Sequence, residues 1–167
     1  MWKPIFILLS SLAILPVQAE KVGDVEFTLP PAARNWELGA KMEKDDPCTT
    51  VIYVPRVILR QNIQEFFGIS TNNKPTENLH EEVVLHASLS KQYPNMNMDL
   101  LLLETDSDSV IYEWLARVEG RECIHGWDRI FSSPKGTTVL RYQTQKVSDV
   151  RQAREDWLPV LQEATLN

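Results

Sequence analysis

Two short segments in the first third of the chain have the hydrophobic pattern of β-strands. Residues 25–29 alternate apolar and polar side chains and are followed by Pro30-Pro31, which predicts a strand at an edge or end of a sheet. Residues 49–54 are rich in β-branched side chains and stop at Pro55, as a strand would. The Asp45-Asp46-Pro47 segment before them predicts a turn.

Three segments have helical spacing. In residues 61–68 the apolar positions 63, 66 and 67 follow the i, i+3, i+4 pattern, which predicts a short helix that Gly68 ends. Thr76 is a suitable N-cap for a second helix that ends before Tyr93-Pro94. Its expected inward stripe is Leu79, Val83, Val84 and Ala87. A third helix is expected from Ser148, with Pro159 bending or shortening its end.

Four consecutive segments between these helices predict a meander of antiparallel strands, because only short turns connect them. They cover residues 98–104, 110–118, 122–131 and 137–146. The Leu100–Leu103 run within them is expected to be a buried strand. The fold class is therefore α+β, with an antiparallel β-sheet of about five to seven strands, a C-terminal four-stranded meander and two or three packing helices. One face of the sheet is expected to be covered and the other partly open.

The N-terminus has the pattern of a secretory signal peptide. Met1-Trp2-Lys3 is positively charged, Pro4 to Val17 carries no charge, and Val17-Gln18-Ala19 offers small residues at the positions that a signal peptidase accepts. The apolar run is shorter than the roughly 20 residues of a spanning helix, although an uncleaved anchor is the alternative. We therefore expect cleavage after Ala19, a single globular domain over residues 20–167, and an exported protein in the periplasm or the medium.

Charge and cysteine content narrow the possible partners and the redox state. Removing Lys3 leaves 16 bases against 23 acids, a net charge of about −7, which disfavours nucleic acid and anionic lipid. In an oxidising compartment the two cysteines, Cys48 and Cys123, are expected to form a disulfide bond, worth about 4 kcal/mol in the chain-entropy model. The alternative is two unpaired buried thiols.

Several short motifs resemble those of small exported bacterial proteins of the Mog1/PsbP-like fold. They are Phe27 to Pro30, Trp36, Tyr53 to Pro55, Asn62 to Phe66 and Ile111 to Trp114. The resemblance covers most of the predicted mature chain. It implies a binding or assembly factor and mildly disfavours an enzyme, although a fold by itself does not transmit a function.

The sequence contains residue types that occur in catalytic and metal-binding sites, but their spacing matches no known site of either kind. His80 and His86 are six residues apart and point away from each other on a helix, unlike the i, i+4 histidines of zinc helices, and His80 is expected to face solvent. Cys123 and His125 share a strand face but make only two ligands. No Gly-x-Ser-x-Gly motif occurs. We predict no catalytic residues, no metal site and no cofactor.

Aromatic side chains on the predicted meander are the better candidates for a binding surface. Residues two apart on a strand share one face, and this groups Tyr112 with Trp114 and His125 with Trp127, with Tyr142 as a further member. The alternative is that at least half of these rings belong to the core. The leading hypothesis is a non-enzymatic exported binding or accessory protein, an envelope-assembly factor or an exported effector, that binds a protein or peptide, or a sugar. The other hypothesis is a small secreted hydrolase with a dispersed active site.

Overall fold

The computed structural model describes residues 19–43, 49–56, 64–89, 95–119 and 121–167, with residues 42, 43, 89, 121–123 and 147 described by their backbone alone. The predicted signal peptide lies outside the described residues up to Gln18, and its cleavage site stays a prediction. Cys48 and the Cys123 side chain also lie outside them, so the disulfide bond stays a prediction as well.

A small antiparallel sheet joins the two ends of the described chain. It contains β1 (Ala19–Val22), β2 (Val25–Thr28) and β10 (Thr165–Leu166), in the order β1-β2-β10. The prediction of a strand at residues 25–29 is confirmed, but its expected edge position is wrong. β2 lies in the centre because the C-terminal residues Thr165 and Leu166 pair with Glu26 and Val25, a contact that no local pattern contains.

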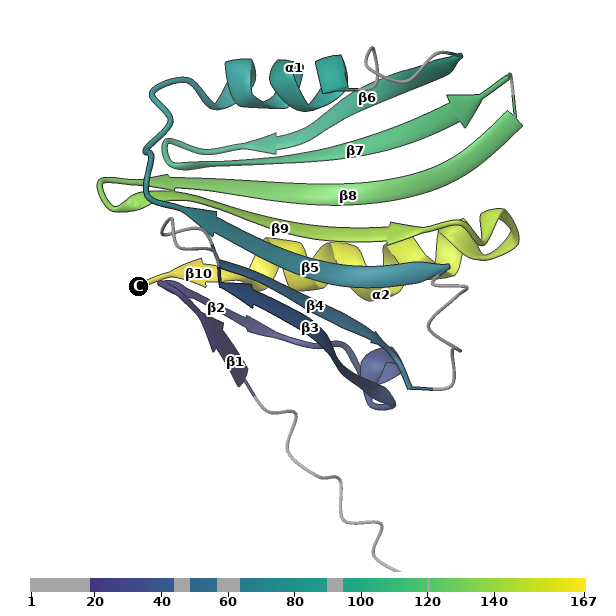
Figure 1. The fold of residues 1–167 in the computed structure, drawn as a ribbon, viewed down its shortest axis with the longest axis horizontal. Coiled ribbons are helices and arrows are strands. Elements are labelled where there is room, and N and C mark those ends of the chain that lie inside the picture. The colour runs from purple at the N-terminus through teal and green to yellow at the C-terminus, as the bar shows by residue number, and fades with distance from the viewer. Residues whose placement is uncertain (1–18, 44–48, 57–63, 90–94, 120) are drawn as a thin grey trace, which may run out of the picture.

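The main sheet has seven strands, and every neighbouring pair is antiparallel. The strand order is β3-β4-β5-β9-β8-β7-β6 (Figure 1). The strands are β3 (Trp36–Glu43), β4 (Thr49–Pro55), β5 (Glu65–Asn72), β6 (Met96–Thr105), β7 (Ser109–Val118), β8 (Arg121–Ser133) and β9 (Gly136–Thr144). The structure confirms the α+β class and the C-terminal meander, which is β6 to β9. The seven strands of this sheet are the upper end of the predicted range of five to seven.

The helix predicted over residues 61–68 is wrong where the structure describes it. Residues 65–68 begin β5, which pairs with β4 on one side and with β9 on the other. Phe67 and Ile69 are fully buried on one face of this strand. The i, i+3, i+4 spacing is compatible with either element in so short a segment, and pairing with two distant strands decides for the strand.

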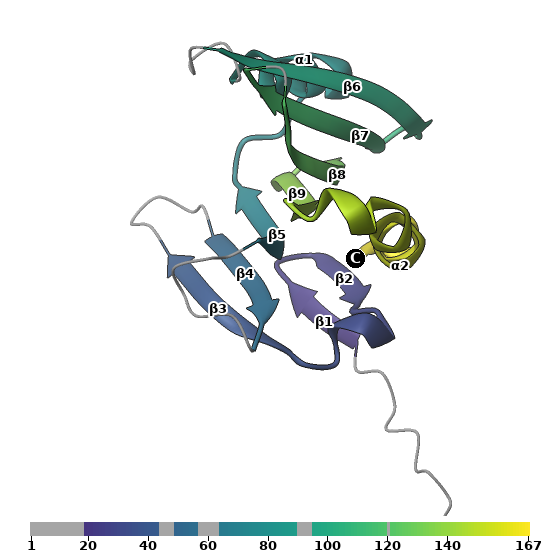
Figure 2. The ribbon, with the colours of Figure 1, turned by 90° about the vertical axis from the view of Figure 1, so that its right-hand side faces the viewer.

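Two helices cover opposite faces of the main sheet (Figures 1 and 2). Helix α1 (Leu79–Leu89) packs against β6 and β7, whereas α2 (Val150–Glu163) lies between β8 and β9 on one side and β2 on the other. Helix α1 packs mainly against the β6 and β7 end of its face, which agrees with the expectation of one covered and one partly open face. Helix α2 follows the short 3₁₀ turn η3 (Val147–Asp149) and continues past Pro159.

Each sheet face has its own hydrophobic core. Trp127 and Phe131 of β8 pack with the small sheet and α2, while Ile130 faces the α1 side. This division follows from the alternation of side chains along a strand. In α1, Val83 is buried, but Val84 is 66% exposed, so its predicted place in the inward stripe is wrong.

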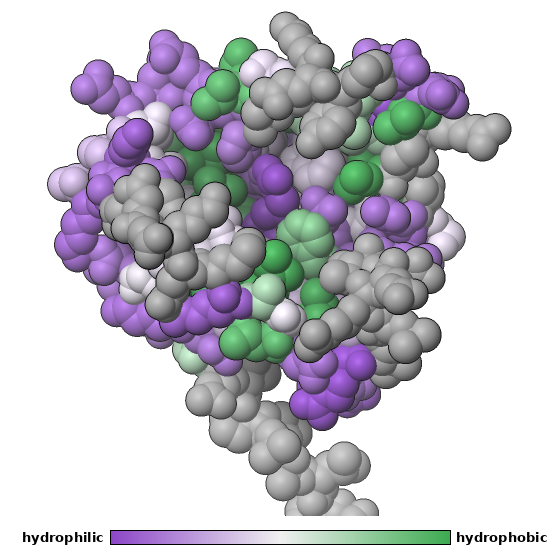
Figure 3. Space-filling model, in the orientation of Figure 1, coloured by the Kyte–Doolittle hydropathy of each residue, from purple (hydrophilic) through white to green (hydrophobic). Residues whose placement is uncertain are grey.

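The edge strand β6 exposes part of its leucine run. Leu101 is 57% exposed, and Leu102 is also exposed, which contradicts the predicted buried strand. The reason is topological: β6 has a neighbour on one side only, and α2 packs mainly against β8 and β9, reaching β6 through a hydrogen bond from Gln162 to Glu104. In Figure 3, hydrophilic residues cover most of the margin of the face shown, and hydrophobic residues gather in smaller groups nearer its middle.

Candidate functional site

The aromatic surface predicted on the meander does not form. Tyr112, Trp114, Trp127 and Tyr142 are all buried, and His125 is only partly exposed. They also divide between the two faces of the sheet, with Tyr112 and Trp114 on the α1 side and the other three on the α2 side. The alternative prediction, that these rings belong to the core, is the correct one. Their strands have neighbours on both sides, and a helix covers each face of the sheet there.

Tyr112 and Trp114 belong instead to a buried polar cluster around Asp128. The Tyr112 hydroxyl donates to Oδ2 of Asp128 at 2.7 Å, and the Trp114 indole N–H donates to Oδ1 at 2.9 Å. Arg141 donates to both carboxylate oxygens, with Nε at 2.9 Å from Oδ1 and Nη2 at 2.5 Å from Oδ2. Since the Tyr112 hydroxyl hydrogen is committed to Asp128, its oxygen accepts from Nδ1 of His86 at 2.6 Å.

The charge of Asp128 is balanced by groups within this cluster. Burial by itself would raise the pKa of Asp128, but the charge of Arg141 and the hydrogen bonds from His86, Arg141 and Tyr112 outweigh it and lower that pKa. Burial and the neighbouring carboxylate raise the pKa of Tyr112. The Asp128 carboxylate is 0% exposed and fully bonded, so it is ionised and cannot meet a substrate. This cluster is a structural element of the α1 face.

A second polar group lies on the α2 face. Nε2 of His125 is 2.6 Å from Oε1 of Glu113, and Arg154 of α2 is 3.6 Å from the other oxygen of that carboxylate. The His125 ring stacks on Trp127 with centroids 4.8 Å apart. These contacts connect β7, β8 and α2, and they place His125 in packing rather than in an open surface.

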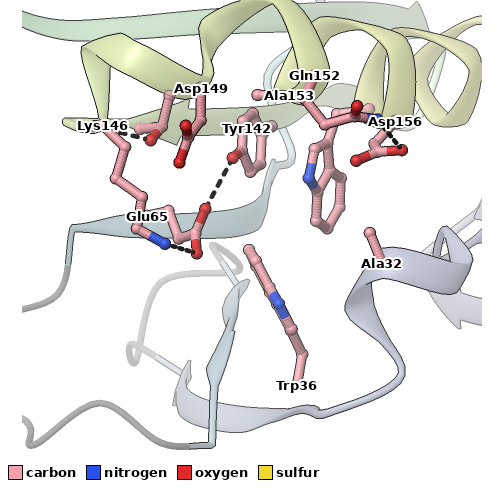
Figure 4. Close-up of a pocket in the computed structure, with 11 residues that line it drawn as sticks. Ala32, Trp36, Glu65, Tyr142, Lys146, Asp149, Gln152, Ala153 and Asp156 are labelled. Atoms are coloured by element: carbon pink, nitrogen blue, oxygen red, sulfur yellow. Dashed lines mark hydrogen bonds and ion pairs between the residues drawn. The ribbon is translucent and has the colours of Figure 1, made fainter.

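The surface feature best suited to binding is a cleft under the N-terminal half of α2, with a volume of about 260 Å³ (Figure 4). We call it the α2 cleft. Its walls come from η1 (Pro31–Ala33), β3, β5, β9, η3 and α2. The residues that line it are Ala32, Trp36, Glu65, Tyr142, Thr144, Lys146, Asp149, Gln152, Ala153, Asp156 and Trp157.

Three aromatic rings form the apolar part of the α2 cleft. Tyr142 stacks on Trp157 with centroids 4.5 Å apart, and Trp36 lies 4.8 Å from Trp157. Tyr142 and Trp157 are buried, whereas Trp36, at the start of β3, is partly exposed. A rigid aromatic wall with one accessible ring gives contact area at little cost in side-chain entropy.

The polar groups of the α2 cleft are unequally paired. Glu65 accepts hydrogen bonds from the Tyr142 hydroxyl at 3.0 Å and from Nζ of Lys146 at 2.6 Å. The negative charge of Glu65 and the positive charge of Lys146 therefore compensate each other. Burial, followed by the charge of Glu65, raises the pKa of Tyr142. Asp149 and Asp156 lie on either side of Tyr142 in Figure 4, and neither forms an ion pair within the described part of the chain.

The histidines do not converge on a metal-binding arrangement in the described residues. No group of three or more His, Cys, Asp or Glu side chains within that part of the chain could hold a metal ion. His80 is exposed, as predicted, while His86 bonds to Tyr112. Neither α1 nor α2 has the length and apolar character that crossing a bilayer would require.

Sequence reasoning missed the α2 cleft because its residues come from six elements that lie far apart in the chain. The sequence marks Trp36 only within a family-like motif, and Asp149 only as the neighbour of Ser148 at the expected start of the third helix. Trp157 falls on the apolar side of α2 and predicts core packing, which it also provides. No local spacing indicates that these three residues meet.

The described elements form an α+β protein of the PsbP-like fold, as the sequence motifs suggested. The solution structure of cyanobacterial PsbP (CyanoP) from Synechocystis sp. PCC 6803 superposes with a TM-score of 0.67 at 9% identity, covering 96% of this chain and 99% of that one. No family model matches the sequence, and no curated protein matches it. At this identity the likeness establishes the fold alone.

Proposed function

We propose that this protein is an exported, non-enzymatic accessory protein that binds a protein or peptide partner in the α2 cleft. The observation that carries the proposal is the accessible ring of Trp36 beside two carboxylates without ion-pair partners, Asp149 and Asp156. Binding sites typically combine an apolar wall with a few polar groups that fix orientation. The PsbP-like fold and the signal-like N-terminus support the same reading.

A non-enzymatic role is favoured by where the strongly perturbed groups lie. Displaced pKa values often mark catalytic residues when they occur in a cleft. Here Asp128, Tyr112 and Arg141 bond to one another between the sheet and α1, on the face opposite the α2 cleft. The displaced group within the cleft is Tyr142, whose raised pKa keeps its hydroxyl protonated and donating to Glu65. These displaced pKa values accompany hydrogen-bonded pairs within the packed structure, which favours a non-enzymatic role.

The test is to block the cleft without removing packing. Ala32 is exposed on the cleft wall, so Ala32→Phe fills the opening, and Val84→Phe on the exposed side of α1 is the matched control. The full-length chain, tagged at its C-terminus, is expressed in its source cells and captured from the envelope fraction. Mass spectrometry of the captured protein checks that its N-terminus is Glu20.

We expect a partner that co-purifies with the wild type and with Val84→Phe but is lost with Ala32→Phe, at equal expression and thermal stability. Recovery of the same partner with Ala32→Phe would overturn the cleft as the binding site. An intact Met1 on protein from the cytosol would overturn export.

A further inference from the structure

We infer that the α2 cleft receives a basic side chain, an arginine or lysine, presented by a peptide segment of the partner. This inference rests on the proposed function and names the ligand class for the same site. It comes from three independent features of the cleft: its uncompensated charge, its accessible aromatic ring and an unused hydrogen-bond donor.

The charge of the cleft favours a cation. Lys146 is held by Glu65 at 2.6 Å, which leaves Asp149 and Asp156 as the charges that a ligand meets. Oδ1 of Asp149 accepts from the Ser148 hydroxyl and Oδ1 of Asp156 from the Gln152 amide, so each carboxylate is oriented by a neutral neighbour while its second oxygen stays available. Asp149 also stands at the start of α2, next to the positive end of the helix dipole.

The aromatic wall suits the same cation. A guanidinium or ammonium group over an indole face is attracted by the ring quadrupole, and tryptophan is the strongest of the aromatic residues in this respect. Trp36 offers a partly exposed ring, held in place by its contact with Trp157 at 4.8 Å. The volume of about 260 Å³ fits one long side chain rather than a large ligand.

The unused donor indicates that the cation arrives on a peptide. Trp157 is only 3% exposed, and its indole N–H has no acceptor among the described residues. Within those residues, the side-chain atoms that are shielded from solvent and also lack a hydrogen-bond partner are Oε2 of Glu113 and Nε1 of Trp127. The Trp157 N–H therefore keeps access through the cleft that it lines, and a peptide carbonyl supplies the acceptor it lacks.

The probe is the blocked pentapeptide acetyl-Gly-Gly-Arg-Gly-Gly-amide, titrated into the mature protein and followed by the indole N–H signals in ¹H–¹⁵N NMR spectra. Trp36→Phe and Trp157→Phe assign the two signals. The same peptide with citrulline in place of arginine keeps the shape and removes the charge. We expect saturable shifts of both signals with the arginine peptide, and at least a fivefold weaker response with citrulline.

A charge-matched pair of variants isolates the carboxylates. Asp149→Asn with Asp156→Asn removes both charges from the cleft, whereas Glu155→Gln with Glu163→Gln removes two charges from α2 outside it. Each partly exposed ion pair contributes about 1.4- to 5-fold in affinity, so the cleft variant is expected to bind about 2- to 25-fold more weakly. The control is expected to bind as the wild type does.

Three results would overturn the inference. They are equal binding of the arginine and citrulline peptides, equal loss of affinity in both double variants, and no binding of the arginine peptide. If the peptide fails while Ala32→Phe still abolishes partner capture, the cleft is the binding site and the ligand class is wrong. If the peptide binds as expected but Ala32→Phe leaves partner capture unchanged, the cationic site exists and the proposed function fails.

Discussion

Replacement of Asp128 by asparagine is the sharpest test of the buried cluster on the α1 face. The carboxylate is 0% exposed and accepts hydrogen bonds from Tyr112, Trp114 and Arg141. Asparagine keeps the size of the side chain but turns one acceptor oxygen into a donor that faces other donors. It also leaves the Arg141 guanidinium without its counter-charge.

The expected cost follows from this geometry. Removing one partner of a buried, hydrogen-bonded ion pair destabilises a protein by about 3–5 kcal/mol. For a domain of about 150 residues this corresponds to a fall in Tm of roughly 6–20 °C. Urea unfolding followed by tryptophan fluorescence measures the change as a lower midpoint at an unchanged m-value.

Asp156→Asn is the matched control, because Asp156 is partly exposed and has no ion-pair partner in the described chain. Its free energy of unfolding is expected to change by no more than about 0.5 kcal/mol. If Asp128→Asn is as mild as this control, the cluster does not stabilise the fold in the way we describe. In a double-mutant cycle, Arg141→Met should cost less in the Asp128→Asn background than in the wild type.

The pH dependence of stability has a definite sign. The pKa of Asp128 is lower in the folded state than the ordinary carboxyl value of about 3.9, so the folded state favours the ionised form. Its contribution is fully present above about pH 4 and is lost as the pH falls below that value. Between pH 4 and pH 2 the wild type should therefore lose more stability than Asp128→Asn, and parallel curves would contradict the lowered pKa.

Two further substitutions test the packing on the same face. Trp114→Ala should lower the free energy of unfolding by about 3–5 kcal/mol in urea, because the ring is 5% exposed and bonded to Asp128; a stable variant would place this ring outside the core. Gly126→Ala should cost about 1–3 kcal/mol, because a Cβ atom there would lie within 3 Å of the Trp114 ring. Adding Gly126→Ala to Trp114→Ala should cost much less, and equal costs in both backgrounds would refute this contact.

Local signals identified the meander well. Each of the four strands β6 to β9 is long, β-branched or aromatic, and joined to the next by a short polar turn, so neighbours in the sequence are also neighbours in the sheet. Helix α2 likewise has one continuous apolar side, with Trp157 and Leu161 buried, and it begins at Val150, close to the start at Ser148 that the sequence predicts. In these elements local pattern and tertiary contact agree.

The predictions from local pattern were wrong where tertiary contacts favour a different structure. Phe66 and Phe67 fit one side of a helix, yet β5 forms a strand because β4 and β9 lie on either side of it. Leu101 is as apolar as a core residue, yet it is exposed because β6 is an edge strand and α2 packs mainly against β8 and β9. An apolar side chain indicates what could be buried, and the position of its strand in the sheet decides whether it is.

The sequence by itself determined the α+β class, the order of the C-terminal strands, the acidic charge and the export prediction, because each depends on composition or on neighbouring residues. Only the tertiary structure decided that Tyr112 and Trp114 enclose Asp128, and that Trp36, Asp149 and Trp157 share one cleft. The physical reason is that the cleft joins residues more than a hundred positions apart, and that the Asp128 cluster depends on the exact register of β7 on β8. Local spacing fixes neither of them.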